Sequence, residues 1–228
     1  MKDKQVKAVL FDLDGTLADS NEAHAEVWDR AFREAGHAVG RAAIRGQIGK
    51  GGDQLVPALI AQADEDEVEQ LSNRHGEIFK AEWLHRIRPF PQARALLERV
   101  HAAGAKVVLA SSASKAELDH YIDLLDAKPL VDAGTSIDDV ETSKPAPDIF
   151  GTALGKAGVA ADEAVAVGDT PYDIEAAGQA GIATVALRSG GFSDDALAGA
   201  VAIYDDAAAL LAGFDTSPLA APLRDSTT

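Results

Sequence analysis

The feature that most constrains this chain is an apolar run over residues 6–11 that ends in Asp12 and Asp14, followed at once by Gly15. Such a run is typical of a strand buried in a sheet, whereas aspartate is depleted in strands. Alternate side chains of an extended segment lie on one face, so we expect both carboxylates to approach one small volume. They ionise together only if a cation lies between them; otherwise one keeps its proton. Either outcome indicates a reactive or metal-binding site rather than a purely structural role for these residues.

Composition excludes several classes of protein. The 228 residues are 46% hydrophobic, enough for one sizeable core and a smaller second unit. A net charge of −16 argues against nucleic acid or an anionic membrane as partner, because both need clustered lysine and arginine. The absence of cysteine excludes disulfides, thiolate zinc sites and cysteine nucleophiles. The first apolar run is too short for a signal peptide and no segment approaches 18 apolar residues, so we expect a cytoplasmic protein.

Residues from about 20 to 86 carry apolar side chains at helical spacing, with no strand pattern among them. A glycine-rich break at 48–52 interrupts this block, and Asp64 with Glu67 forms a candidate capping box for its last helix. The stiff connector Arg-Pro-Phe-Pro at 88–91 ends the block. We therefore expect an all-helical unit inserted after the first strand.

Strand and helix patterns alternate beyond the connector. Further strands are expected at 106–110, 164–167, 183–187 and 200–203. Helices are expected to end near Gly104, to begin at Ser114 with Glu117 as its capping partner, and to span 148–157 before Gly158. This alternation predicts an α/β fold, a doubly wound, parallel, Rossmann-like sheet. We expect a core of residues 1–18 and 88–213, an insertion of 19–87, and a flexible tail of 214–228.

Polar residues follow several of these strands, where ligands bind in sheets of this kind. They are Asp12, Asp14, Ser111, Ser112, Asp169 and Asp173, with Lys144 on a loop between Ser143 and Pro145. Some have ordinary explanations as well. Ser111 could satisfy backbone groups, Lys144 could be a solvated charge, and Asp173 could interact with a helix dipole.

Four segments resemble the motifs of the haloacid dehalogenase (HAD) superfamily, in the family's order. They are Asp-Leu-Asp-Gly-Thr at 12–16, Ser111, Ser-Lys-Pro at 143–145, and Gly-Asp-Thr-Pro-Tyr-Asp at 168–173. The likeness extends to about residue 192. The helical block resembles the C1-type cap of subfamily I, as in phosphoglycolate phosphatase and β-phosphoglucomutase relatives.

The resemblance implies a phosphatase that hydrolyses a small phosphorylated metabolite through an aspartyl-phosphate. Asp12 would be the nucleophile. Asp14 would act first as general acid and then as general base, with a pKa raised by burial under the cap. Ser111 would hydrogen-bond the phosphoryl oxygens, and Lys144 would balance the charge of phosphate and nucleophile.

The resemblance also implies Mg²⁺ as the cofactor, which suits oxygen ligands. Asp12, the backbone carbonyl of Asp14, and Asp169 would hold the ion, with Asp173 just outside these ligands.

The candidate substrate-contacting residues are Gly15, Thr16, His24, Lys50, Gly51 and Ser112. His24 lies in a hinge-like pattern and would either orient Asp14 or be a surface histidine. Lys50 lies where relatives place a specificity loop, so it would meet an anionic substrate tail or be a solvated loop charge.

Two differences from the mutase-like relatives favour hydrolysis over intramolecular phosphoryl transfer. Mutase-like proteins carry an acidic residue before the aspartate of the fourth motif and an arginine in the cap loop, whereas this chain has Gly168 and an arginine-free loop. A phosphomutase of the β-phosphoglucomutase type is thus the main alternative. A phosphonatase, which needs a cap lysine that Lys50 does not clearly match, and a non-catalytic binding protein on the same fold also stay open. A monomer or homodimer is expected.

Overall fold

The computed structural model describes residues 5–220, in which six strands form one parallel sheet of order β3-β2-β1-β4-β5-β6. The strands are β1 (Ala8–Phe11), β2 (Lys106–Ala110), β3 (Val131–Thr135), β4 (Ala164–Gly168), β5 (Ala183–Leu187) and β6 (Ala202–Tyr204). The order runs outward from β1 in both directions, which confirms the doubly wound α/β prediction.

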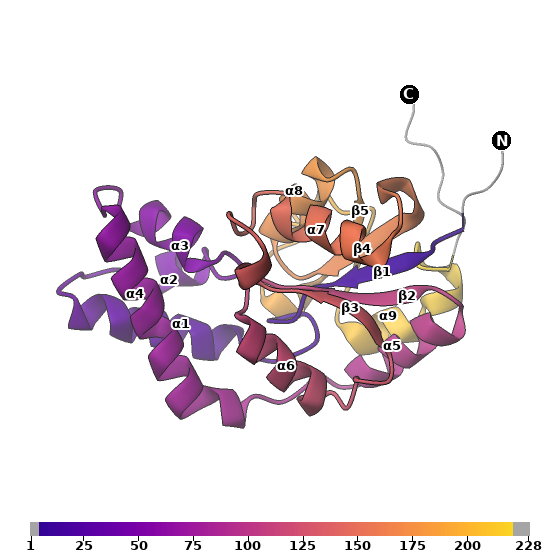
Figure 1. The fold of residues 1–228 in the computed structure, drawn as a ribbon, viewed down its shortest axis with the longest axis horizontal. Helices are drawn as coiled ribbons and strands as arrows, with labels where there is room; N and C mark the ends of the chain where they lie inside the picture. Colours follow the sequence, from indigo (N-terminus) through magenta and orange to yellow (C-terminus); the bar gives the residue numbers. More distant parts are fainter. Residues whose placement is uncertain (1–4, 221–228) are drawn as a thin grey trace.

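Helices cover both faces of the sheet (Figure 1). α5 (Ala93–Ala102), α6 (Lys115–Leu124) and α9 (Ala207–Ala212) pack on one face, and α7 (Asp148–Ala157) and α8 (Pro171–Gln179) on the other. Along β1, Val9 and Phe11 belong to the first apolar cluster, whereas Ala8 and Leu10 belong to the second. This alternation follows from the two-residue period of a strand and fixes which side chains each helix layer meets.

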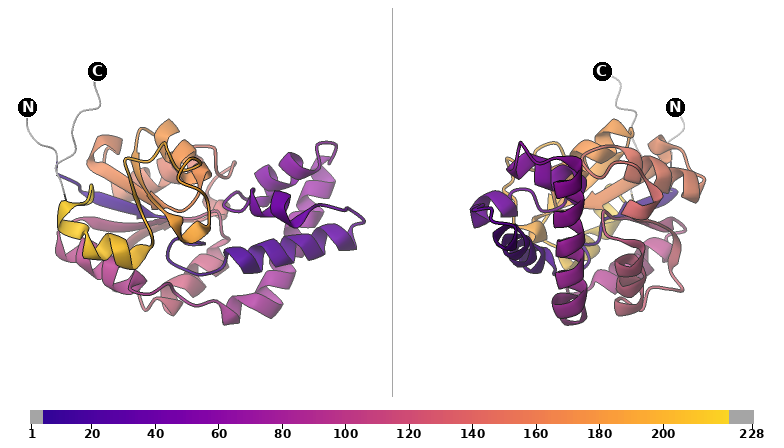
Figure 2. Two further views of the ribbon diagram at one scale, coloured as in Figure 1. Left: turned by 180° about the vertical axis from the view of Figure 1, so that it is seen from behind. Right: turned by 60° about the vertical axis from the view of Figure 1, so that its left-hand side comes forward.

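The segment between β1 and β2 is a helical insertion, as predicted. It comprises α1 (Asn21–Glu34), α2 (Arg41–Arg45), α3 (Gly52–Leu59) and α4 (Glu65–Ile78), which continues into the short turns Phe79–Trp83 and Leu84–Arg86. The insertion has an apolar cluster of its own around Trp28, Phe32 and Leu55. Two views show it beyond the carboxyl ends of the strands (Figure 2).

The two linkers that join the insertion to the sheet domain are bonded to each other. Asp19 N–H donates to the carbonyl of Arg88 at 2.9 Å, and Phe90 N–H donates to the carbonyl of Leu17 at 2.9 Å. The extended conformation that prolines favour around residue 89 supplies this pairing. The entry and exit of the insertion are therefore held side by side.

Three details differ from the sequence-based expectation. β3 was not predicted, because its sequence Val-Asp-Ala-Gly-Thr has no apolar alternation. The expected flexible tail is packed in its described part, since Phe214 and Leu219 are buried in the core; residues 221–228 lie outside the described residues. Asp64 caps α4 through Glu67 N–H, but the Glu67 carboxylate binds His37 Nε2 at 2.7 Å rather than closing a capping box.

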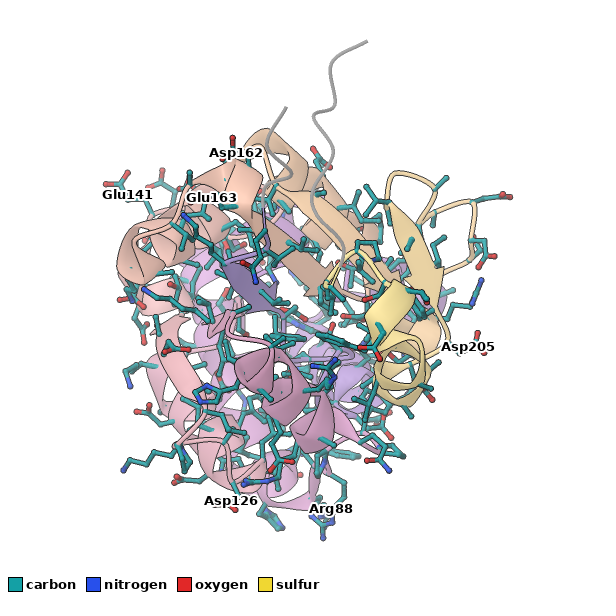
Figure 3. The ribbon with its side chains drawn as sticks, turned by 90° about the vertical axis from the view of Figure 1, so that its right-hand side faces the viewer. Arg88, Asp126, Glu141, Asp162, Glu163 and Asp205 are labelled. Carbon is teal, nitrogen blue, oxygen red and sulfur yellow. The ribbon has the colours of Figure 1, made fainter. Side chains whose placement is uncertain are left out.

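Figure 3 shows the sheet domain from the side away from the insertion, with the side chains of Asp126, Glu141 and Asp205 at the outline of the molecule. Over residues 5–220, no helix combines the length and the apolar character needed to cross a bilayer.

Candidate active site

A cavity of about 1010 Å³ lies between the carboxyl ends of the strands and the helical insertion. Strand-end residues form one part of its lining, and α4 with the glycine-rich loop forms the other. The lining includes Asp12, Asp14, His24, Lys50, Gly51, Ser111 and Ser112. Seven of the residues singled out from the sequence thus meet around one space.

Asp12 continues directly from β1, where its N–H donates to the Val167 carbonyl at 2.9 Å. Its carboxylate accepts a hydrogen bond from Lys144, whose Nζ also lies 2.7 Å from Asp173 Oδ1. All three side chains are almost fully buried. Burial opposes the charge of Lys144, but Asp12 and Asp173 outweigh it and raise the pKa of this lysine. Lys144 is therefore a buried ammonium rather than a solvated surface charge.

Asp169 follows β4 and is held in one orientation. Thr16 Oγ1 donates to its Oδ1 at 2.8 Å, and Asn21 Nδ2 donates to its Oδ2 at 2.9 Å. A Cβ on Gly15, whose φ is +82°, would lie 2.1 Å from Asp169 Oδ2, so no side chain fits there. The sequence-based assignment differs here: Gly15 and Thr16 pack around Asp169 and do not line the cavity.

Asp173 serves two neighbours at once. Its Oδ2 accepts from Thr170 N–H at 3.1 Å and Thr170 Oγ1 at 2.6 Å, which completes a capping box at the start of α8. Its Oδ1 faces Lys144. The expectation of a helix-start carboxylate and that of a place beside the metal site therefore both agree with its position.

The acidic residues fit a divalent cation. Asp12, Asp169 and Asp173 each offer a carboxylate oxygen, and these atoms lie within 4.8 Å of one another. Burial raises the pKa of Asp12 to about 7, even beside Lys144, and raises the pKa of Asp169 well above its ordinary 3.8. Three carboxylates this close repel one another, so ionising all of them is unfavourable unless a cation binds among them. The Asp14 side chain is outside this group, while Asp173 is inside it.

We expect added Mg²⁺ to raise the melting temperature, and to raise it more at pH 8 than at pH 5.5. Because the folded-state pKa of Asp12 exceeds its ordinary value, metal-free stability falls as the pH rises from about 4 to about 7. Mg²⁺ needs ionised ligands and offsets this fall, by about 2.7 kcal/mol at a concentration of 100 times Kd. Thermal unfolding with MgCl₂ or EDTA at both pH values measures the effect. Asp169→Asn should abolish it; an equal Mg²⁺ effect at both pH values would contradict the assignment.

The Asp14 carboxylate is stabilised in its charged form, which corrects the prediction of a raised pKa. Burial does oppose ionisation, but the charge of His24 and hydrogen bonds from His24, Ser20 and Tyr121 outweigh it and lower the pKa to about 2. His24 Nε2 lies 3.1 Å from Asp14 Oδ1, so this histidine contacts Asp14 and is not a surface group. Asp14 is therefore an ionised carboxylate in this state.

The two serines after β2 differ in what they contact. Ser111 Oγ accepts from Ala113 N–H at 3.0 Å, so its backbone role is present alongside its position on the cavity. Ser112 Oγ is buried and has no hydrogen-bond partner within residues 5–220. A buried hydroxyl without a partner is unfavourable, and an oxygen-rich ligand in the cavity would supply one.

The glycine-rich loop of the insertion contacts the sheet domain. Gly51 N–H donates to Ser143 Oγ at 2.9 Å, and Ser143 N–H donates to Asp53 Oδ2 at 3.0 Å. Lys50 Nζ bonds Gln47 Oε1 at 2.7 Å and lies 4.5 Å from the centre of the Tyr172 ring. Lys50 and Gly51, both candidate substrate contacts, line the cavity, but the N–H of Gly51 is engaged by Ser143.

Four residues with a clear place at the site were not singled out as site residues from the sequence. They are Asn21 on Asp169, Ser20 and Tyr121 on Asp14, and His75, whose Nε2 lies 3.2 Å from His24 Nδ1. Their positions in helical patterns indicated only which face each residue occupies. No local signal connects them with the strand ends.

Comparison with known proteins agrees with this geometry. The family model of haloacid dehalogenase-like hydrolases matches residues 9–187. Phosphoglycolate phosphatase of Yersinia pestis is 32% identical over 195 residues, which cover 83% of this chain and 84% of that protein. Phosphorylated carbohydrates phosphatase of Thermotoga maritima is 28% identical over 178 residues, covering 78% and 82%.

A hydrolase from Pseudomonas syringae has a solved structure with a TM-score of 0.86, 29% identity, and coverage of 92% of this chain and 98% of that one. The family match spans both strand-end aspartate segments and the helical insertion between them. With its buried acidic group at the carboxyl edge of the sheet, this chain belongs to the haloacid dehalogenase-like hydrolases and is a phosphatase of that family.

Proposed function

We propose that this protein is a Mg²⁺-dependent phosphatase that hydrolyses a small phosphate monoester, with Asp12 as the nucleophile. The observation that carries this proposal is the position of the Asp12 carboxylate. It lies at the end of β1, on the cavity, beside the Lys144 ammonium and within the group formed with Asp169 and Asp173. Phosphoryl transfer depends mainly on positioning and charge stabilisation, which these residues supply.

In the first half of the reaction, an oxygen of Asp12 attacks phosphorus, and the bond from phosphorus to the leaving oxygen breaks with its electron pair. Lys144 balances the negative charge that gathers between Asp12 and the phosphoryl group. Asp14 gives a proton to the leaving oxygen. The phosphoryl dianion raises the pKa of Asp14 when it arrives, because two nearby negative charges oppose ionisation.

In the second half, Asp14 takes a proton from the water that attacks the aspartyl-phosphate. Phosphate is released and Asp12 regains its carboxylate. The low pKa of Asp14 in the present structure leaves its carboxylate ionised and able to accept a proton, and the nearby phosphoryl charge raises this pKa toward the range in which a general base is effective. When bound by Asp12, Asp169 and Asp173, Mg²⁺ supplies positive charge to the phosphoryl oxygens.

Gly168 supports hydrolysis over a mutase reaction. A Cβ at Gly168 would lie 2.5 Å from the Asp173 side chain, so the acidic residue that mutase-like relatives carry at this position does not fit here. The glycine-rich loop at 48–52 also contains no arginine, unlike the cap loop of those relatives.

We expect purified protein to release phosphate from several small monoesters in the presence of Mg²⁺. A panel of glycerol 2-phosphate, hexose phosphates, 2-phosphoglycolate and 4-nitrophenyl phosphate measures this release. With glucose 1-phosphate, free glucose and phosphate are expected rather than glucose 6-phosphate. Accumulation of the 6-isomer would instead favour the phosphomutase alternative, and no turnover of any ester would favour a binding protein.

A further inference from the structure

The Asp14 carboxylate is held through one of its two oxygens. Ser20 Oγ at 2.5 Å, His24 Nε2 at 3.1 Å and Tyr121 Oη at 2.6 Å all donate to Oδ1. Within residues 5–220, no hydrogen bond to Oδ2 is found, and Asp14 lines the cavity. The acceptor capacity of Oδ1 is thus occupied by protein, and Oδ2 is left for the reacting groups.

Tyr121 is the unusual member of this set. It is completely buried on the face of α6 that packs against the sheet, among apolar side chains where phenylalanine would fill nearly the same volume. Burying a phenol without a partner is unfavourable, and its partner is the Asp14 carboxylate. Burial and the charge of Asp14 raise the pKa of Tyr121 well above 10, so the phenol keeps its proton and donates.

The three donors come from different parts of the molecule. Ser20 and His24 lie at the start of the helical insertion, whereas Tyr121 belongs to a helix of the sheet domain. A hydrogen bond from the sheet domain holds the Asp14 side chain at a fixed position relative to Asp12, which follows β1 of the same sheet. Tyr121 does not line the cavity, so it touches Asp14 and not the substrate.

We propose that Tyr121 is a positioning residue for phosphoryl transfer: it fixes Oδ1 of Asp14 so that Oδ2 exchanges the proton. As the phosphorus–oxygen bond breaks, the proton passes from Oδ2 to the leaving oxygen. As the aspartyl-phosphate is hydrolysed, a proton of the attacking water passes to Oδ2. This inference rests on the proposed function, because it assigns Asp14 the acid–base role.

Leaving-group dependence of Tyr121→Phe tests the proposal. Glycerol 2-phosphate needs a proton on its leaving alkoxide, whereas 4-nitrophenolate leaves without one. We expect kcat for glycerol 2-phosphate to fall about tenfold, a part of the 10²- to 10⁴-fold that general acid–base catalysis supplies. KM should change less than about twofold, and so should the rate of the first-turnover burst of 4-nitrophenolate. Tyr204→Phe is the matched control, since Tyr204 packs against the same apolar cluster on β6.

A double-mutant cycle with Asp14→Asn separates positioning from damage to the fold. If Tyr121 acts through Asp14, adding Tyr121→Phe to Asp14→Asn should leave the residual rate on glycerol 2-phosphate unchanged. An equal fall in the kcat for glycerol 2-phosphate and in the 4-nitrophenolate burst rate, no fall in either, or a further loss in the double mutant would overturn the proposal. If instead Asp12→Asn kept its activity, the proposed function itself would fail, so the two failures are distinguishable.

Discussion

Replacing Asp12 by asparagine is expected to lower phosphate release by roughly 10⁴-fold or more, because a neutral amide is a far weaker nucleophile than a carboxylate. The substitution keeps the size of the side chain. It also removes one of three mutually repelling carboxylates at a site where burial raises the pKa of Asp12 to about 7. We therefore expect the variant to fold and to unfold at the same temperature as the wild type or higher. The substitution should therefore lower the activity without lowering the melting temperature.

The measurement is phosphate release from 4-nitrophenyl phosphate, together with trapping of a radiolabelled phosphoenzyme by acid quench. Wild-type protein should retain label on Asp12, and Asp12→Asn should not. Asp138→Asn is a suitable control, since Asp138 also lines the cavity but accepts from Lys115 N–H at the start of α6, away from the acidic group. An Asp12→Asn enzyme with more than a few per cent of wild-type activity would contradict the assignment of Asp12 as the nucleophile.

Replacing Lys144 by methionine is expected to destabilise the protein and to abolish activity. Lys144 is 1% exposed and neutralises Asp12 and Asp173, so its loss leaves buried carboxylates without their cation. Removing one partner of a buried ion pair costs about 3–5 kcal/mol. Methionine fills a similar volume, so the loss reflects charge rather than a cavity.

The pH dependence distinguishes this cause from poor packing. Without Lys144, the folded state binds protons on these carboxylates more tightly than the unfolded chain does. Stability of the variant therefore rises as the pH falls, and its deficit relative to wild type should be smaller at pH 5 than at pH 8. Urea unfolding at both pH values, without metal, provides the comparison. Lys156→Met, which removes a lysine paired with Asp139 on the surface, should cost less than about 1 kcal/mol. A deficit that does not change with pH would contradict the charge-based explanation.

Local patterns predicted much of the sheet domain because each element carries its own signal. β2, β5 and α7 have the predicted bounds. Gly158, in the left-handed conformation at φ 65°, ends α7 as expected of a glycine after a helix. β3 lacked such a signal: it is an edge strand whose pairing with β2 depends on the finished sheet.

The candidate site divides in the same way. The strand-end aspartates could be found from the sequence because a carboxylate is unusual directly after an apolar run that is expected to be buried. The charge state of Asp14 could not, since it depends on the charge and hydrogen bond of His24 and on hydrogen bonds from Ser20 and Tyr121, the last of which is 107 positions away in the chain. The expectation of a raised pKa considered burial alone, whereas the charge of His24 and three hydrogen-bond donors reverse the direction of the shift.

The amino-acid sequence by itself determined the alternation of strands and helices, the helical insertion and the acidic residues at the strand ends. These depend on side-chain periodicity and on turn residues, which act over a few positions. Only the tertiary structure decided that Asp173 joins Asp12 and Asp169, that Lys144 is a buried ammonium between two of them, and that a phenol from α6 holds Asp14. The physical reason is that charge interactions and hydrogen bonds depend on distance in space, and the order of the strands sets those distances.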